Sequence, residues 1–446
     1  MGKFDAVIGN PPYLPYRKID PTRREAALRI LAASGLKLDR RASLWAYFVL
    51  LSIRFVRNGG RMAWVLPSSF LYANYSHNLR TYIAGLFSNV LAFEIQERQF
   101  LVEGTEEKTV VLLADGKLAN PLSDPKVDIP LSRCSGVREL DAQISMWATG
   151  ELETSSACGT SVFDSLSKAP RDLILQLESS QHCHKIGDHL RVQIGLVTGD
   201  NKFFLCNDDE RKDAGLYVAN LVPVLPRFTY ASGLEFDSDD FDKMIRTGGQ
   251  GYLVSSGEID SAANDIKNYL ATYPEDKKST CSTFKKRTVW SKADDGSVPD
   301  AFFPVMQHNG PRLILNNTGV NCTNSVHRGY FKTVKSKTEK SLIALATIST
   351  FSQLSAEIVG RSYGSGALKH EPREAEKIAI LLPPVHHRKV LSAYQKADKY
   401  LRNGNFSEAN QIADYLILGA MGFDDVATYA SILRSGLTQA RTHRRR

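Results

Sequence analysis

Short apolar runs alternate with helical patterns along the first part of this chain. The run Phe4–Gly9 predicts a short buried strand closed by glycine. Between residues 44 and 57, apolar side chains recur at spacings of three and four, which predicts a helix with one buried face that Asn58-Gly59-Gly60 should end. The run 61–67 predicts another buried strand. Helix, glycine pair, strand and proline in this order are typical of an α/β unit.

The same alternation continues toward residue 113. A helix is predicted over 78–86, and strands are predicted over 90–95 and 109–113. A polar turn, 104–108, precedes the second of these strands. The two strands and the turn therefore predict a hairpin.

Beyond residue 116 the pattern becomes less regular. Apolar periodicity weakens and prolines appear as far as residue 180, which predicts a connector with one helix near 165–177. The stretch 192–205 then predicts strand, glycine turn and strand, and the segments 285–290, 312–316 and 323–325 are expected to be β-rich. Amphipathic stretches after Pro383 predict a helical C-terminal segment.

Composition limits the class of protein. The chain has 446 residues, 43% of them hydrophobic, which allows two or three domains with real cores. A formal net charge of +8 permits nucleic-acid binding without proving it. Six scattered cysteines without a C-x-x-C pair predict reduced thiols in a cytoplasmic protein. No metal site is predicted, because His182-Cys183-His184 is followed by no second ligand cluster. The apolar run 48–56 is too short to span a membrane.

The stretch Asn10-Pro11-Pro12-Tyr13 carries the clearest chemistry. It follows the first predicted strand, and ligands of open α/β sheets bind at the carboxyl ends of strands. The Asn10 side-chain oxygen and a proline carbonyl can accept two N–H bonds from an exocyclic amine, while Tyr13 stacks on its ring. This arrangement suits methylation of an aromatic amino group. A tight proline turn, with Asn10 bonding its own backbone, is the structural alternative.

Residues 4–13 resemble the catalytic motif of amino-methyltransferases that use S-adenosylmethionine (SAM). Through most of its length the chain is similar to the gamma-class N6-adenine DNA methyltransferases of bacterial restriction-modification and phage-defence systems. The resemblance implies an α/β fold: a partial Rossmann-like SAM-methyltransferase sheet, a mixed α/β target-recognition domain and C-terminal helices. It also implies site-specific methylation of duplex DNA at adenine N6, with SAM as cofactor.

Roles for individual residues near the catalytic motif follow from the resemblance. Asn10, Pro12 and Phe48 correspond to cofactor-contacting positions, and Phe48 would pack on the SAM adenine. Tyr13 and Phe100 correspond to the aromatic residues that stack on the flipped target base. A plain core phenylalanine is the alternative for Phe48.

The resemblance extends to the second half of the chain. The stretch 192–205 is similar to the "G-I-x-T-G-x-N-x-F" hairpin at the entry to target-recognition domains. The stretch 361–372 is similar to the family's "Y-G-x-G-x-L-K-x-E-P" signature. A simple hairpin with a capped turn is the alternative for the first stretch. DNA contacts are expected from Thr198, Asn201, Lys202, Arg361 and Lys369.

One departure from the family lies at the start of the chain. In the gamma class, a Gly-rich SAM-binding loop and an acidic residue for the ribose precede the Asn-Pro-Pro-Tyr motif, whereas only nine residues precede Asn10 here. The first strands of the sheet are therefore expected to come from a second polypeptide that carries the Gly-rich motif. A truncated gene or a misassigned start codon is the competing explanation. Without its neighbour, the first strand would expose an apolar edge.

The expected function is adenine-N6 methylation of specific DNA sites by one subunit of a split enzyme. The alternatives are a non-catalytic DNA-binding specificity subunit, a truncated remnant, or an enzyme that methylates an amine in RNA or protein. The expected organisation has four segments: the catalytic half of a methyltransferase domain (1–118), a connector (119–180), a target-recognition domain (181–384) and a helical segment with a basic tail (385–446).

Overall fold

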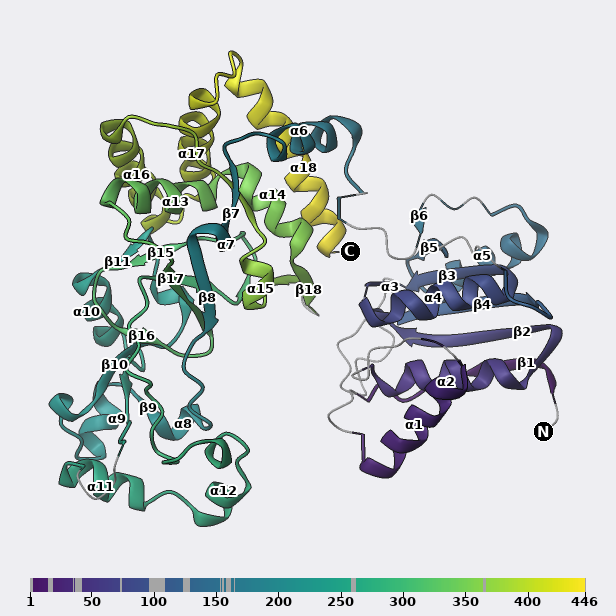
Figure 1. Ribbon diagram of the computed structural model, residues 1–446, viewed down its shortest axis with the longest axis horizontal. Coiled ribbons are helices and arrows are strands. Elements are labelled where there is room, and N and C mark those ends of the chain that lie inside the picture. The colour runs from purple at the N-terminus through teal and green to yellow at the C-terminus, as the bar shows by residue number, and fades with distance from the viewer. Residues whose placement is uncertain are drawn as a thin grey trace. The chain divides into compact units, whose positions relative to one another are not determined.

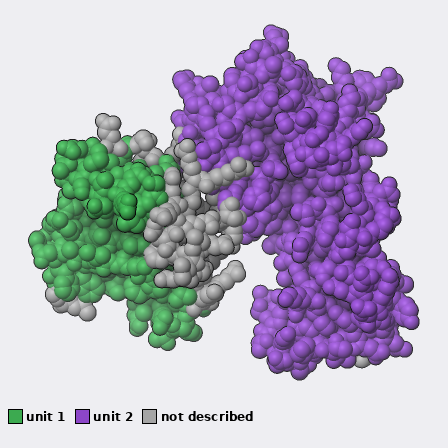
Figure 2. All heavy atoms as spheres, turned by 180° about the vertical axis from the view of Figure 1, so that it is seen from behind, with its two compact units in different colours: residues 1–161, 446 green, residues 162–445 purple. Residues whose placement is uncertain are grey.

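The computed structural model describes residues 3–14, 19–34, 36, 42–72, 74–95, 109–122, 129–152, 154, 156–157, 162–163, 165–257, 262–363 and 366–445. Contacts divide the chain into two compact units, residues 1–161 and residues 162–445 (Figure 2). Each unit has its own sheets and its own core, so each is described by itself.

Unit 1 is built on a six-stranded mixed sheet with the order β1-β2-β4-β3-β5-β6 (Figure 1). Strand β1 pairs parallel with β2, and β3 pairs parallel with β5. Strand β4 is antiparallel to both β2 and β3, which confirms the predicted β3–β4 antiparallel pair. The strands are β1 (Phe4–Gly9), β2 (Val56–Pro67), β3 (Phe87–Ile95), β4 (Thr109–Lys117), β5 (Pro130–Cys134) and β6 (Ser156–Ala157).

Helices cover both faces of this sheet, because successive strand residues point to opposite sides. Leu112 of β4 lies in a core with Trp45 and Phe70, whereas its neighbour Leu113 packs in a second core with Phe93. The expected α/β fold class is confirmed by this arrangement. The helices are α1 (Pro21–Ser34), α2 (Leu44–Ser52), the 3-10 turn η2 (Ile53–Phe55), α3 (Ser69–Tyr72), α4 (Asn74–Leu86) and α5 (Val137–Thr149).

Part of the predicted connector, 119–180, is integrated into unit 1. Strand β5 extends the sheet, and Glu94 of β3 is ion-paired with Arg133 of β5 at 2.9 Å. Helix α5 covers the second core with Leu140, Ile144 and Trp147. The division between the compact units therefore falls at residue 161.

The predicted role of Asn58-Gly59-Gly60 as a helix terminator is wrong. The helical stretch already ends at Phe55, and β2 runs through all three residues. Phe4 pairs with Val56 while Ala6 pairs with Arg61, so β2 carries extra residues in a bulge. A Cβ on Gly60 would lie 2.9 Å from the Asp5 carbonyl oxygen, so the bulge needs glycine at this position.

Unit 2 contains four smaller sheets. Their orders are β11-β15-β13-β17-β8, β16-β10-β12-β9, β14-β19-β18 and β20-β7. The strands are β7 (Cys183–Lys185), β8 (Leu190–Ile194), β9 (Leu205–Cys206), β10 (Val222–Leu225), β11 (Glu235–Phe236), β12 (Tyr252–Leu253), β13 (Ala301–Pro304), β14 (Met306–Gln307), β15 (Ile314–Asn316), β16 (Asn321–Cys322), β17 (Val326–Phe331), β18 (Arg361–Tyr363), β19 (Ala367–Lys369) and β20 (Ala379–Leu381).

One large core of unit 2 is shared by helices α6, α13, α14, α16, α17 and α18 and by strand β20 (Figure 1). The helical segment predicted over 385–446 therefore shares its core with residues from 166 onward. The helices are α6 (Lys168–Glu178), α7 (Ile186–His189), α8 (Asn201–Phe204), α9 (Asp208–Asp213), α10 (Ser238–Arg246), α11 (Asn264–Ala271), α12 (Glu275–Thr280), α13 (Lys337–Ile348), α14 (Thr350–Val359), α15 (Pro372–Ala375), α16 (His387–Arg402), α17 (Phe406–Ala420) and α18 (Val426–Arg445). Within the described residues no single helix has the length and composition of a membrane span, although the bent pair α13–α14 passes that test.

The hairpin predicted over 192–205 is wrong. Strands β8 and β9 lie in different sheets, and helix α8 stands between them. The residues between β8 and α8 therefore cross from the five-stranded sheet to the four-stranded sheet. Of the three segments expected to be β-rich, 312–316 contains β15. The expectation is wrong for 285–290, which starts within the 3-10 turn η6 (Phe284–Lys286), and for 323–325, which follows β16 as a bridge residue and a turn.

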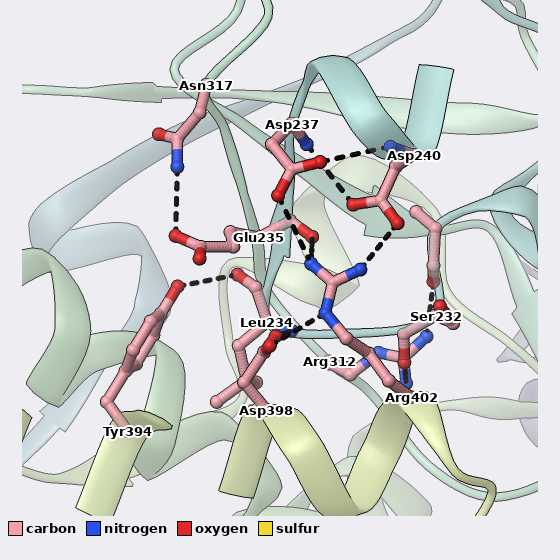
Figure 3. A network of polar contacts seen from close by, with 11 residues as sticks. Ser232, Leu234, Glu235, Asp237, Asp240, Arg312, Asn317, Tyr394, Asp398 and Arg402 are labelled. Carbon is pink, nitrogen blue, oxygen red and sulfur yellow. Dashed lines mark hydrogen bonds and ion pairs between the residues drawn. The ribbon is translucent and has the colours of Figure 1, made fainter. Parts of the chain in front are cut away.

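A polar network attaches helix α16 to the first turn of α10 and to the segment that precedes it (Figure 3). The Arg402 guanidinium donates to Asp398 at 2.7 Å and to Asp240 at 2.5 Å. Burial opposes its charge, but the bonds to these carboxylates raise the pKa of Arg402 above its ordinary value. Tyr394 adds a bond from its hydroxyl to the Leu234 carbonyl at 3.0 Å. The network joins residues about 160 positions apart in the chain.

Candidate active site and nucleic-acid interface

The Asn-Pro-Pro-Tyr motif begins at the carboxyl end of β1. Asn10 and Pro12 are exposed, Pro11 is buried, and Tyr13 is partly buried against the core of unit 1. The next residue, Leu14, accepts a hydrogen bond from the Leu44 amide at the start of α2, at 2.9 Å. The motif is thus held between a strand end and a helix start, with a polar amide facing outward.

Gly9 sets the position at which β1 delivers Asn10. It pairs with Trp64 of β2, and a Cβ added at Gly9 would lie only 2.5 Å from the Trp64 ring. Such a distance is far below van der Waals contact. Glycine is therefore required for β1 to pass this close to the indole.

Strand β1 is the outermost strand of the described sheet, and it exposes apolar side chains beside the Asp5–Arg57 ion pair. Ile8 is 81% exposed and Phe4 is 57% exposed, which is unusual for a strand inside an α/β domain. Phe48 on α2 is 44% exposed, although most of its helix is buried. The exposed apolar edge that was predicted for this strand is present.

Of the two aromatic residues expected to contact the cofactor and the target base, the structure describes only Phe48. Phe48 is not the plain core phenylalanine that was the alternative, because nearly half of its surface is open. Its ring can therefore contact a ligand. Phe100 and the polar turn 104–108 lie outside the described residues.

The recognition residues predicted at 198–202 point in different directions. Thr198 is buried, and its hydroxyl donates to the Asn201 side-chain oxygen at 2.5 Å. Asn201 and Lys202 are exposed at the start of α8, where Asp200 caps the helix by accepting from the Lys202 amide at 3.1 Å. Only the last two of the three predicted contacts therefore face solvent, while Thr198 supports Asn201.

Arg361 and Lys369 lie directly opposite each other on the antiparallel pair β18–β19. Each has an acidic partner: Arg361 contacts Glu374 at 2.5 Å, and Lys369 contacts Glu371 at 2.9 Å. The hydrogen bond from Lys369 lowers the pKa of Glu371 below its ordinary value. Two cations stand side by side here because two carboxylates balance them, and a DNA phosphate would have to compete with those carboxylates.

Sequence reasoning missed a pocket near the end of β8. It has a volume of about 470 Å³ and takes charged residues from segments distant in sequence. No local pattern brings these residues together; the signal in the sequence was a run of basic residues near 285–292. The lining residues are Ile194, Gly195, Leu196, Val197, Arg287, Lys292, Ala293, Asp294, Asp295 and Arg328.

A parallel β1–β2 pair, an antiparallel β4 beside it and Asn-Pro-Pro-Tyr at the end of β1 are typical of the methyltransferase class of α/β proteins. Comparison with family models agrees. The model of the Type II methyltransferase M.Eco57I, C-terminal domain, matches residues 161–418, and that of the Eco57I restriction-modification methylase matches residues 1–96. The first match spans more than half of the chain, which therefore belongs to the family of the Type II methyltransferase M.Eco57I, C-terminal domain.

Individual relatives are distant. The Type II methyltransferase M.AccI of Acinetobacter calcoaceticus is 21% identical over 385 residues, which cover 85% of this chain and 69% of that protein. Among solved structures, the Type IIL restriction-modification enzyme MmeI in complex with DNA has a TM-score of 0.53 at 12% identity, covering 98% of this chain. The Type IIG restriction endonuclease BpuSI has a TM-score of 0.39 at 16% identity. This chain spans 57% and 55% of those two structures. The likeness to MmeI supports the fold alone.

Proposed function

We propose that this chain is the catalytic-motif and target-recognition part of a restriction-modification DNA methyltransferase. Its reaction would be site-specific transfer of a methyl group from SAM to adenine N6 in duplex DNA. The observation that carries the proposal is the exposed Asn10 amide at the carboxyl end of β1, within an Asn-Pro-Pro-Tyr motif. In this proposal the protein acts in the cytoplasm as part of a phage-defence system.

The chemistry of the target base would depend on residues 10–13. Asn10 would accept a hydrogen bond from one N6 hydrogen and the Pro11 carbonyl from the other, which turns the nitrogen lone pair toward the methyl donor. After methyl transfer, one N6 proton would be lost to solvent. Pro11 is buried, and burial would shield that second bond from water. Extruding the adenine from the duplex costs a few kcal/mol. Stacking on Tyr13 would offset about 1–3 kcal/mol of this, and Phe100 is proposed as a second stacking residue.

The described residues fit one wall of a SAM site. Phe48 offers an open aromatic face, and Asn10 and Pro12 are exposed beside the strand end. When bound, SAM supplies an electrophilic methyl group. We propose that a second polypeptide carries the Gly-rich part of the site and pairs with the open edge of β1. The 81% exposure of Ile8 supports this pairing, because a partner that extends the sheet and packs on its face would cover this side chain.

Transfer of labelled methyl from SAM to duplex DNA tests the proposal. The chain is assayed alone and together with a polypeptide that carries a Gly-rich SAM motif and is encoded beside it. Transfer only in the mixture is expected. Transfer by the chain alone would refute the split site, and DNA binding without transfer in either assay would refute the catalytic function.

Asn10→Ala should abolish transfer and leave DNA affinity nearly intact, because the residue acts on the base only after binding. The matched control is Asn89→Ala, an exposed asparagine on β3, which should retain full activity. Retained transfer in Asn10→Ala would remove this residue from the chemistry.

Tyr13→Ala should reduce transfer more than DNA binding, whereas Tyr13→Phe should retain most activity because the ring face remains. Filter binding and initial rates, measured on the same duplex, check this. Equal losses of binding and transfer in Tyr13→Ala would contradict a stacking role.

A second candidate function is a non-catalytic DNA-binding specificity subunit or a truncated remnant. The open edge of β1 favours this second function as much as the catalytic one, because that edge leaves the described sheet incomplete on the side of the motif. SAM binding by the reconstituted complex separates the two: an enzyme binds SAM, and a specificity subunit does not.

A further inference from the structure

The pocket near the end of β8 lies where the chain crosses between two sheets of unit 2. Leu196 forms an isolated bridge with Thr323, and its amide donates to the Cys322 carbonyl at 2.8 Å. The Asn324 amide in turn donates to the Leu196 carbonyl at 2.8 Å. The segment 194–198 is therefore anchored at its middle to the β16–β17 connection.

Arg287 holds the far end of this segment. Its guanidinium donates to the carbonyls of Val197 and Thr198, the second at 3.1 Å, and to the Trp290 carbonyl at 3.0 Å. Burial lowers the pKa of Arg287 below its ordinary value. Three backbone acceptors use this side chain, which makes it a positioning residue for the pocket wall.

Arg328 holds the near end in the same way. It donates to the Ile194 carbonyl at 3.1 Å and to Asp295 at 2.7 Å. Its burial is offset by the bond to Asp295, which raises the pKa of Arg328 above its ordinary value. The two arginines thus fix the backbone of one wall and the orientation of one carboxylate.

Four side chains of the pocket remain for a ligand. Lys292 is exposed, and no ion pair of it occurs in the part of the chain that the structure describes. Asp294 accepts from Asn321 at 3.1 Å through one carboxylate oxygen. Ile194 and Val197 are 46% and 45% exposed at the pocket, although they are apolar. Exposed apolar side chains beside a donor and an acceptor are typical of a binding surface.

We propose that this pocket reads one G·C base pair of the DNA recognition sequence in the major groove; the proposal rests on DNA being the substrate. Lys292 would donate to guanine O6 and N7, and Asp294 would accept from cytosine N4. Ile194 and Val197 would cover the apolar edge of the neighbouring base. A carboxylate repels phosphate, so Asp294 suits a base edge and not the DNA backbone.

Selection of bound duplexes from a random-sequence pool tests the proposal, using the full chain with the partner it needs. Asp294→Asn retains the shape and the bond from Asn321, and Lys292→Met retains the apolar stem. Both should relax the enriched motif at one G·C position, by on the order of tenfold, and leave the other positions unchanged. The matched controls, Asp242→Asn and Lys277→Met, change exposed residues of α10 and α12 and should keep the motif.

The outcomes separate this inference from the proposed function. A wild-type motif that both pocket variants retain unchanged would overturn the inference, as would a uniform loss of preference at all positions. A wild-type protein that enriches no motif would also overturn it. If the wild type enriches a motif that relaxes in the variants but transfers no methyl to the selected DNA, the methyltransferase function fails and the base-reading pocket stands.

Discussion

Arg402→Met tests the network that attaches α16 to α10 and to the segment before it. Methionine keeps the apolar stem of the side chain and removes its three charge-assisted contacts with Asp398, Asp240 and Asp237. The first two carboxylates would lose their cation at sites where their side chains are only 14% and 7% exposed. The perturbation therefore leaves buried negative charge and creates no large cavity.

The expected cost follows from that burial. Removing one partner of a buried ion pair costs about 3–5 kcal/mol. Arg402 is itself 27% exposed, so water can reach part of the site and the lower end, about 3 kcal/mol, is expected. If the cost comes from unpaired charge, the double variant Arg402→Met/Asp240→Asn should be less destabilised than Arg402→Met alone.

Urea unfolding provides the free energy of unfolding, and hydrogen exchange of the α16 amides locates the change. Arg388→Met is the matched control, because Arg388 is exposed on the same helix and should change stability by less than about 0.5 kcal/mol. A loss of under about 1 kcal/mol in Arg402→Met would refute the reasoning. So would a double variant whose two losses simply add.

Three further predictions concern single positions. Burial raises the pKa of Asp414 to about 6, so the protonated carboxyl contributes about 3 kcal/mol to the free energy of unfolding, and this contribution is lost as pH rises from about 4 to 6. Asp414→Asn should remove this loss, which urea unfolding at several pH values would measure. Burial lowers the pKa of His370 to about 4, so the neutral imidazole contributes about 3 kcal/mol to the free energy of unfolding, and this contribution is lost as pH falls from about 6.5 to 4. In His370→Gln, the free energy of unfolding should therefore fall less steeply over this pH range than in the wild type. Unchanged pH slopes in either variant would contradict these assignments. Gly9→Ala should cost about 1–3 kcal/mol by overpacking against Trp64, and wild-type stability in that variant would show that β1 can shift.

Much of unit 1 could be predicted from local pattern. The helices at 44–52 and 74–86 and the strands β3 and β4 follow apolar periodicity, because each buries a face that its own sequence defines. The exposure of β1 did not follow from local pattern, because the apolar run Phe4–Gly9 predicts a buried strand, whereas none of its residues is buried; the expectation of an open edge rested on the family resemblance. The position of Asn10 at a strand end could be predicted from the order of residues alone.

Other features could not be predicted, because they depend on which distant segments meet. Asn58-Gly59-Gly60 has the composition of a helix end, yet it bulges inside β2, since only pairing with β1 shows that this strand carries extra residues. The glycine turn after β8 has the pattern of a hairpin. Its two flanking strands pair instead with β17 and β12, which lie in different sheets.

By itself, then, the sequence predicted that Asn-Pro-Pro-Tyr follows the first strand, and it predicted most of the strands and helices around that motif. These depend on neighbouring residues and on periodicity, which the chain carries locally. Tertiary structure alone decided that Thr198 is buried while Asn201 faces solvent, and that Arg287 and Arg328 hold the pocket wall from sites about 90 and 134 residues away along the chain. The physical reason is that buried guanidinium groups must find acceptors, and the nearest carbonyls in space belong to a segment that is remote in sequence.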